Sequence, residues 1–250
     1  MPATTTSTLS PLVKKLKLWG PLDQASEDAI LALPHKVEDV SPQKYLVREG
    51  EKAAYTCLLL DGFAYRQKVL VDGSRSIVSI HMKGDPVDLQ NSMLGIADHS
   101  VQTLTAARVA FIPIGDIRQI AIDFPSVGMA MWYDTLVDGS IFREWIANVA
   151  RRNAATRISH LLCEFGMRLE SLGLGDRHSY ELPMTQEQLA DCTGLTPVHI
   201  NRTLMDLESR GYIARAKRFV AIADWGKMAQ LSGFNDTYLH LRKEGSLLPH

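Results

Sequence analysis

The stretch that decides the fold is TQEQLADCTGLTPVHINRTLMDLESRG, residues 185–211, which contains two helix starts within a dozen residues. Thr185 followed three residues later by Gln188 is a capping-box pattern, in which each side chain bonds the backbone of the other residue. Thr196, followed by a proline at the first helical position, marks the second start, and Gly194 permits the turn between the helices. This spacing predicts a helix-turn-helix.

The second of these helices has a polar face suited to reading DNA. Ile200, Leu204 and Leu207 recur at steps of four and three, which predicts the buried stripe. At about 100° per residue, the opposite face then holds Val198, Arg202, Met205 and Ser209, with His199 and Asn201 on the flanks. Arginine can pair with guanine, asparagine with adenine, and an apolar side chain with a thymine methyl, while a helix N-terminus favours phosphate.

The next segment, RGYIARAKRFVAIADW, predicts two short strands around a basic tip with four cations in nine residues. Together with the two helices it forms a winged helix-turn-helix, whose second helix enters the major groove while the wing contacts phosphates. The alternative is a structural helical hairpin with a solvated basic turn. The predicted DNA-contacting residues are Thr196, Val198, His199, Asn201, Arg202, Arg210, Arg215, Lys217 and Arg218.

The middle of the chain has the pattern of antiparallel β structure. Residues 43–113 fall into short apolar or alternating runs separated by turn residues, which is typical of a sandwich or roll. Asp72-Gly73 between two such runs predicts a hairpin, because glycine supplies the positive φ that tight turns need.

A long helical stretch follows Phe124-Pro125 and is too apolar, to about residue 150, to lie on a surface. We expect it to be buried on more than one side, against the β-roll and against the same helix of a second subunit; the alternative is an ordinary core helix of a monomer. Gly139 weakens a regular coiled coil. A second helix is predicted from about residue 153 to 171. The residues that require burial are Met131, Trp132, Val137, Ile141, Trp145, Ile146 and Val149.

Composition narrows the class of protein but does not name it. The 250 residues with 46% hydrophobic and 22% charged side chains suit a globular chain of two domains, and a net charge of −1 leaves nucleic-acid binding to a local patch. Three scattered cysteines argue against disulfides, zinc knuckles and iron–sulfur clusters. The opening lacks a signal-peptide core, and no apolar run spans a membrane, so we expect a cytoplasmic protein.

These residues resemble the Crp-Fnr family of bacterial transcription regulators over most of the chain. The helix-turn-helix is the most specific match, followed by NAATRISHLLCEF before it and by REGE, LLLDG and KGDP in the β region. The resemblance implies an α+β fold and a homodimer on a near-palindromic site, with Val198, His199, Asn201 and Arg202 reading bases. It implies RNA polymerase as a partner and leaves open a small-molecule effector. The expected parts are a flexible N-terminus (1–20), an antiparallel β-roll of the cyclic-nucleotide-binding jelly-roll type (21–123), a dimerisation helix (124–151), a winged helix-turn-helix (152–228) and a tail (229–250).

The effector cassette departs from the family pattern. Members that bind cyclic nucleotides carry Gly-Glu for the ribose and Arg-Ser for the cyclic phosphate; here we align these pairs with Asp88-Leu89 and His99-Ser100. Leucine cannot accept from a ribose hydroxyl, and a mostly neutral histidine cannot replace the fixed bidentate charge of arginine. We therefore expect an effector other than cyclic AMP.

Other functions find less support in the sequence. A cupin-like metal enzyme would use His81, His99 and Asp88, which lack tight ligand spacing, and haem would need one of these histidines or Cys57. A redox role for Cys192 and a dimeric interaction protein without DNA binding remain alternatives. No GxSxG, P-loop or GxGxxG motif is present. We expect no enzyme activity, cofactor or metal; the operator, the target genes and the sign of regulation stay open.

Overall fold

The computed structural model describes residues 7–241 and divides the chain into two compact units. The first contains two N-terminal helices, a β-roll and the first half of a long helix, with the hairpin tip at residues 70–77 excepted. The second contains the rest of that helix and the C-terminal domain. The boundary within the helix falls between Gly139 and Ser140.

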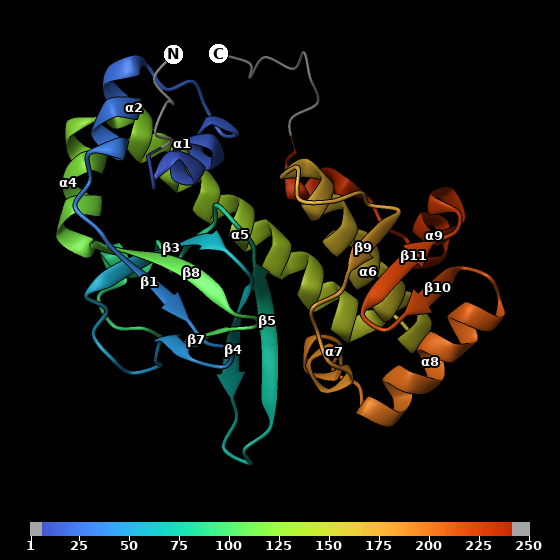
Figure 1. Ribbon diagram of the computed structural model, residues 1–250. Helices are drawn as coiled ribbons and strands as arrows, with labels where there is room; N and C mark the ends of the chain where they lie inside the picture. The colour runs from blue at the N-terminus through green and yellow to red at the C-terminus, as the bar shows by residue number, and fades with distance from the viewer. Residues whose placement is uncertain (1–6, 242–250) are drawn as a thin grey trace. The chain divides into compact units, whose positions relative to one another are not determined.

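The β-roll consists of two four-stranded antiparallel sheets, with strand orders β1-β8-β3-β6 and β2-β7-β4-β5 (Figure 1). Gly73 has a φ of 82° in the turn between β4 and β5, as the hairpin prediction requires. The short helix α3 (Asn91–Leu94) follows β6. The strands are β1 (Lys36–Val40), β2 (Tyr45–Val47), β3 (Tyr55–Asp61), β4 (Ala64–Val69), β5 (Arg75–His81), β6 (Pro86–Val87), β7 (Ser100–Thr103) and β8 (Ala107–Pro113).

Small and β-branched side chains fill the space between the sheets. This core includes Cys57, Leu59, Val101 and Val109, each almost fully buried. Such residues suit the inward positions of twisted strands, where side chains alternate between core and outer face. The predicted roll is confirmed.

The N-terminus requires a correction. Residues 1–20 were expected to be flexible, but the helix α1 (Ser10–Lys17) is formed there. A second helix, α2 (Gln24–Leu31), lies in the range expected to be β-roll, and residues 1–6 lie outside the described residues. The helix α1 buries Leu12 and Leu16 on one face. The indole of Trp19 donates to Asp134 of the long helix at 2.7 Å, which ties this segment to the first unit.

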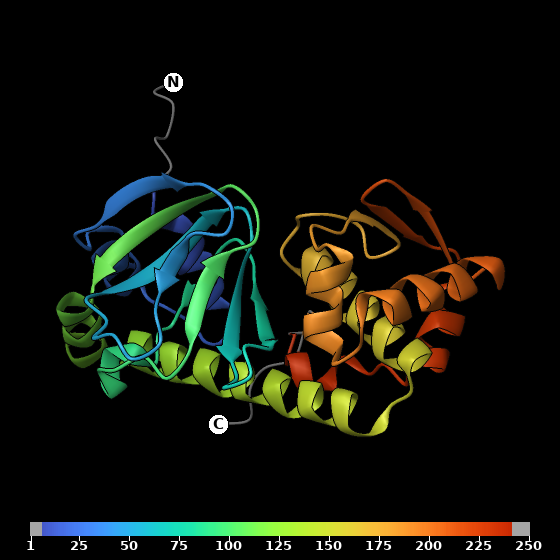
Figure 2. The same ribbon diagram turned by 90° about the horizontal axis from the view of Figure 1, so that it is seen from below.

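The long helix α5 spans Pro125–Arg151 and follows α4 (Ile114–Asp123). Figure 2 shows the first half of α5 running along the β-roll. Of the residues predicted to need burial, four are buried within the chain: Met131, Val137, Ile141 and Trp145. The other three, Trp132, Ile146 and Val149, are exposed in the single chain, so the helix has two apolar faces.

The second unit is a helical domain with a small sheet. It contains α6 (Ala154–Ser171), α7 (Gln186–Thr193) and α8 (Pro197–Ser209), and a sheet of order β10-β11-β9. The side chain of Asn153 caps α6 at the Thr156 N–H, which explains why the helix begins there. The remaining elements are β9 (Ser179–Glu181), β10 (Ile213–Ala216), β11 (Phe219–Ile222), α9 (Trp225–Ser232) and the 3-10 helix η1 (Asp236–Leu239).

The expected boundary at residue 228 is too early. The helix α9 continues to Ser232 and packs on α6, and beyond it the Tyr238 hydroxyl donates to the buried Glu164 carboxylate at 2.7 Å. The segment up to residue 241 is therefore part of this domain; residues 242–250 lie outside the described residues.

Candidate nucleic-acid interface and effector cassette

Both helices of the helix-turn-helix begin where the sequence predicts, and the first also ends at the predicted glycine. Thr185 Oγ1 accepts from the Gln188 N–H at 3.2 Å, and Gln188 Oε1 accepts from the Thr185 N–H at 2.8 Å, which completes the capping box. Gly194 ends α7 in the left-handed conformation with a φ of 64°. The guanidinium of Arg157 on α6 donates to the Thr193 carbonyl at 3.0 Å and holds the turn against the domain.

The second helix, α8, buries one face and exposes the other. Ile200, Leu204 and Leu207 are buried, as the periodicity predicts. On the opposite face Val198, Asn201 and Arg202 are exposed to solvent. Side chains that can bond base edges or touch a thymine methyl thus stand together on the free face of α8.

At the start of α8, two further predicted contact residues have partners of their own. The Thr196 hydroxyl accepts from the His199 N–H at 3.3 Å and so caps the helix, which leaves its own proton free to donate. His199 Nε2 lies 2.6 Å from Arg202 Nη2, so the imidazole accepts from the guanidinium and orients it.

The wing is less basic than its sequence suggests. Arg210 pairs with Asp206 at 3.1 Å and Arg215 with Glu208 at 2.5 Å; both acids lie on α8, just before the segment without acids. Lys217 and Arg218 are exposed at the turn between β10 and β11, and within residues 7–241 neither makes an ion pair. The positive charge available to phosphates is therefore concentrated at the hairpin tip.

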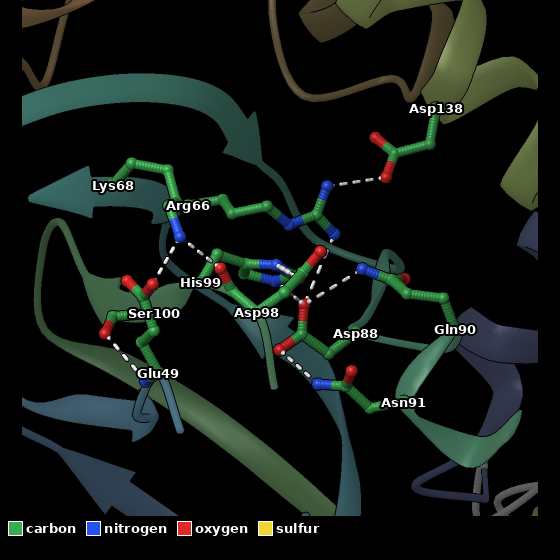
Figure 3. A network of polar contacts seen from close by, with 10 residues as sticks. All are labelled: Glu49, Arg66, Lys68, Asp88, Gln90, Asn91, Asp98, His99, Ser100 and Asp138. Carbon is green, nitrogen blue, oxygen red and sulfur yellow. Dashed lines mark hydrogen bonds and ion pairs between the residues drawn. The ribbon is translucent and has the colours of Figure 1, made fainter. Parts of the chain in front are cut away.

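The structure brings the two halves of the effector cassette together inside the β-roll. Asp88 Oδ1 lies 2.6 Å from His99 Nε2, although the residues are eleven positions apart (Figure 3). The Ser100 hydroxyl accepts from the Glu49 N–H at 3.0 Å, and Leu89 is buried. The four aligned positions thus hold one carboxylate, one imidazole, one hydroxyl already bonded to the backbone, and one apolar side chain.

Sequence reasoning missed two charged partners of this cassette, Arg66 on β4 and Asp138 on α5. Arg66 donates to Asp88 Oδ1 at 3.3 Å and to Asp138 Oδ2 at 2.7 Å (Figure 3). Burial disfavours the charged guanidinium, but the charges of Asp138 and Asp88 outweigh it and raise the pKa of Arg66. Strand alternation does not flag Arg66, because it shares a face of β4 with the charged Lys68, and the structure buries both faces at residues 64–67.

The histidines and cysteines considered for other chemistry are buried. Burial, reinforced by the nearby charge of Arg66, lowers the pKa of His81 to about 4, so this ring is neutral at pH 7. Burial raises the pKa of the Cys192 thiol well above its ordinary value, which disfavours the reactive thiolate. Among residues 7–241, no cluster of three or more His, Cys, Asp or Glu side chains is arranged to hold a metal ion. None of the helices described in this range is long and apolar enough to span a membrane.

Comparison with known proteins matches each of the two parts of the chain to a known domain family. Residues 37–123 match the model of a cyclic nucleotide-binding domain, and residues 156–231 match that of a Crp-like helix-turn-helix domain. The chain is 26% identical over 193 residues to the transcriptional activator protein FnrL of Cereibacter sphaeroides, covering 75% of this chain and 77% of that protein. It is 24% identical over 200 residues to the fumarate and nitrate reduction regulatory protein of Escherichia coli K12, covering 79% and 74% respectively.

The fold is also found in solved structures. The structure of FixK2 from Bradyrhizobium japonicum superposes with a TM-score of 0.72 at 20% identity, over 80% of this chain and 98% of that one. An antiparallel β domain, a long helix and a C-terminal helix-turn-helix are thus shared in the same order. With both domain models matched and regulators aligned over three quarters of its length, this chain belongs to the Crp-Fnr family of transcription regulators.

Proposed function

We propose that the protein is a homodimeric regulator that binds a near-palindromic DNA site through α8 and the β10–β11 wing. The observation that carries this proposal is the capped helix α8 with Asn201 and Arg202 on its free face. Lys217 and Arg218 at the wing tip add the charge that a phosphate contact needs. In this reading His199 positions Arg202, and Val198 contacts a thymine methyl.

The second apolar face of α5 supports the homodimer. Met129, Trp132 and Leu136 recur at helical spacing and are 59%, 60% and 54% exposed in the single chain. Ile146, 65% exposed, continues the same helix after Gly139. Burial of large apolar side chains that lie in a row along a helix is favourable, and the same face of a second α5 would bury them. Two-fold symmetry would then place two α8 helices in major grooves about 34 Å apart.

The proposal extends to the cellular partners of such a regulator. A dimer bound to bacterial DNA would act in the cytoplasm and would contact RNA polymerase in order to change transcription. The degenerate cassette makes cyclic AMP a poor candidate for its signal, because His99 and Leu89 replace the phosphate- and ribose-binding side chains.

The test is selection of binding sites from a random duplex pool by the purified full chain, with no ligand added. We expect enrichment of a two-fold symmetric motif. Enrichment of a single asymmetric half-site would contradict the homodimer. No enrichment, repeated in the presence of cell extract, would contradict DNA recognition, and a dimer in solution would then favour an interaction protein. A stoichiometric metal in the purified protein would instead favour the cupin-like enzyme.

A further inference from the structure

A buried ion-pair network fills the place in the β-roll where the cassette halves meet. The Asp88 side chain is 0% exposed and that of Arg66 is 3% exposed. Asp88 Oδ1 accepts from His99 Nε2 at 2.6 Å and from Arg66 Nη2 at 3.3 Å, and Oδ2 accepts from Asn91 Nδ2 at 3.2 Å (Figure 3). Both carboxylate oxygens are thus satisfied from inside the protein.

The network also reaches the long helix. Arg66 uses its other terminal nitrogen to donate to Asp138 of α5 at 2.7 Å, so one guanidinium bridges the cassette loop and the helix. On the other side, His99 Nδ1 lies 2.5 Å from Asp98 Oδ1. The bridge is made by side chains from β4, from the segment after β6 and from α5.

The backbone at Asp88 shows that this carboxylate is held in place at a cost. Asp88 has a φ of 60°, in the left-handed region that favours glycine. Glycine is also the residue that cyclic-nucleotide-binding members carry at the aligned position. Aspartate enters this region more readily than most side chains but less readily than glycine, and its contacts with Arg66 and His99 compensate for the remaining cost.

We propose that Asp88 is a built-in anion which occupies the effector site and, by binding the guanidinium that also bonds Asp138, links the cassette segment to β4 and α5. An anionic ligand would have to displace the carboxylate from Arg66 and His99, and a phosphate placed beside it would be repelled. The excluded ligand class is thus cyclic nucleotides and other phosphates. The part of this inference that concerns control of DNA binding rests on the proposed function. The role of the network in stability can be tested without DNA.

The experiment is chemical rescue of Asp88→Gly in the full chain. Glycine suits the positive φ and removes the carboxylate, so Arg66, His99 and Asn91 are left without it. We expect the thermal midpoint to fall and formate, a free carboxylate, to restore it in a concentration-dependent manner, whereas neutral formamide does not. Gln43→Gly, which also places glycine at a residue of positive φ (61°) but removes no anion, serves as the matched control and gains nothing from formate.

DNA binding gives the functional readout. On the selected site, Asp88→Gly should weaken binding by about tenfold, within the usual range of coupling between sites, with recovery in formate. If the wild-type chain selects no DNA, the proposed function fails while the thermal rescue still decides the role of Asp88.

Three results would overturn the inference. One is an Asp88→Gly protein as stable as wild type and indifferent to formate. Another is calorimetric binding of cyclic AMP or cyclic GMP by the wild-type chain. The third applies if the glycine variant does not fold even in formate. Asp88→Asn is then used instead, because asparagine tolerates a positive φ and is neutral. A thermal midpoint equal to that of wild type in this variant would contradict the built-in anion.

Discussion

At the scale of single residues, Arg202 is the side chain expected to determine base preference. It lies on the free face of α8, and His199 Nε2 accepts from it at 2.6 Å. We expect Arg202→Ala to cost about 1–3 kcal/mol of binding free energy on the selected site and to relax preference at one base pair. Competition binding against single-base variants of the site measures both effects.

The matched control for this prediction is Arg210→Ala. Arg210 is also exposed, but it is paired with Asp206 one turn earlier, so its loss should change binding little and leave the base preference unaltered. Equal effects of the two substitutions would mean that α8 does not read bases.

His160 gives a residue-scale prediction for pH dependence. Burial, reinforced by the charge of Arg152, lowers the pKa of His160 to about 4, from 6.5 for an unperturbed ring. As pH falls, the unfolded chain therefore takes up this proton before the folded chain does. The contribution of neutral His160 to the free energy of unfolding is complete above pH 6.5 and is lost as pH falls towards 4. Between these values the free energy of unfolding falls by at most about 1.4 kcal/mol per pH unit.

The variant His160→Phe isolates that contribution. Phenylalanine can keep the stacking on Tyr238 and the edge contact with Phe234, and it carries no proton. We expect the thermal midpoint to fall less between pH 7 and pH 5 in His160→Phe than in wild type. His178→Phe, at an exposed histidine of the same domain, should retain the wild-type difference. A parallel fall in all three proteins would assign the pH dependence to other groups.

What the sequence predicts at this scale depends on how far apart the partners lie in the chain. The exposed positions on α8 follow from helical periodicity alone, and the structure agrees at Asn201 and Arg202. The bond between Arg66 and Asp138 joins residues 72 positions apart in different elements, and no local pattern encodes it. The pairing of Arg215 with Glu208 was missed for a simpler reason: Glu208 lies just before residues 210–218, the segment in which only cations were counted.

At the scale of elements, the β10–β11 wing is expected to bind DNA without regard to sequence. Lys217 at its tip is exposed and makes no ion pair within the part of the chain that is described. We expect Lys217→Ala to weaken all duplexes to a similar degree and to reduce the slope of log K against log salt concentration by about one. Titrations of specific and scrambled duplexes at several salt concentrations measure this slope.

The control for the wing is Arg215→Ala, because Arg215 is already neutralised by Glu208 and should barely alter the slope. A clear salt effect at Arg215 would show that the ion pair opens on DNA, and an unchanged slope in Lys217→Ala would show that the tip makes no phosphate contact.

Elements with strong local signals were predicted, and those held by distant contacts were not. Caps at Thr185 and Thr196 and the hairpin turn at Gly73 place their elements from a few neighbouring residues. The helix α1 has no capping side chain and gains its stability from burial of Leu12 and Leu16. The segment after α9 likewise depends on Tyr238 reaching Glu164, 74 residues away.

At the scale of the whole molecule, the proposed dimer predicts that the exposed face of α5 decides whether two α8 helices can act together. Half-sites one helical turn apart are bound jointly only by a dimer, so loss of the dimer should lower affinity for the full site far more than for a half-site. Leu136, which is 54% exposed among apolar neighbours, is the position at which a charge would disrupt a second copy of α5 without disturbing the buried face.

We expect Leu136→Glu to be a folded monomer by sedimentation and to bind the full site no better than a half-site. Ile122→Glu is the matched control: Ile122 is an equally large apolar side chain, 70% exposed, but it lies on α4 and not on α5, and its variant should remain a dimer with wild-type affinity. A dimeric Leu136→Glu would place the interface elsewhere. A monomeric variant that kept full-site affinity would show that the two-fold symmetry of the DNA site does not depend on α5.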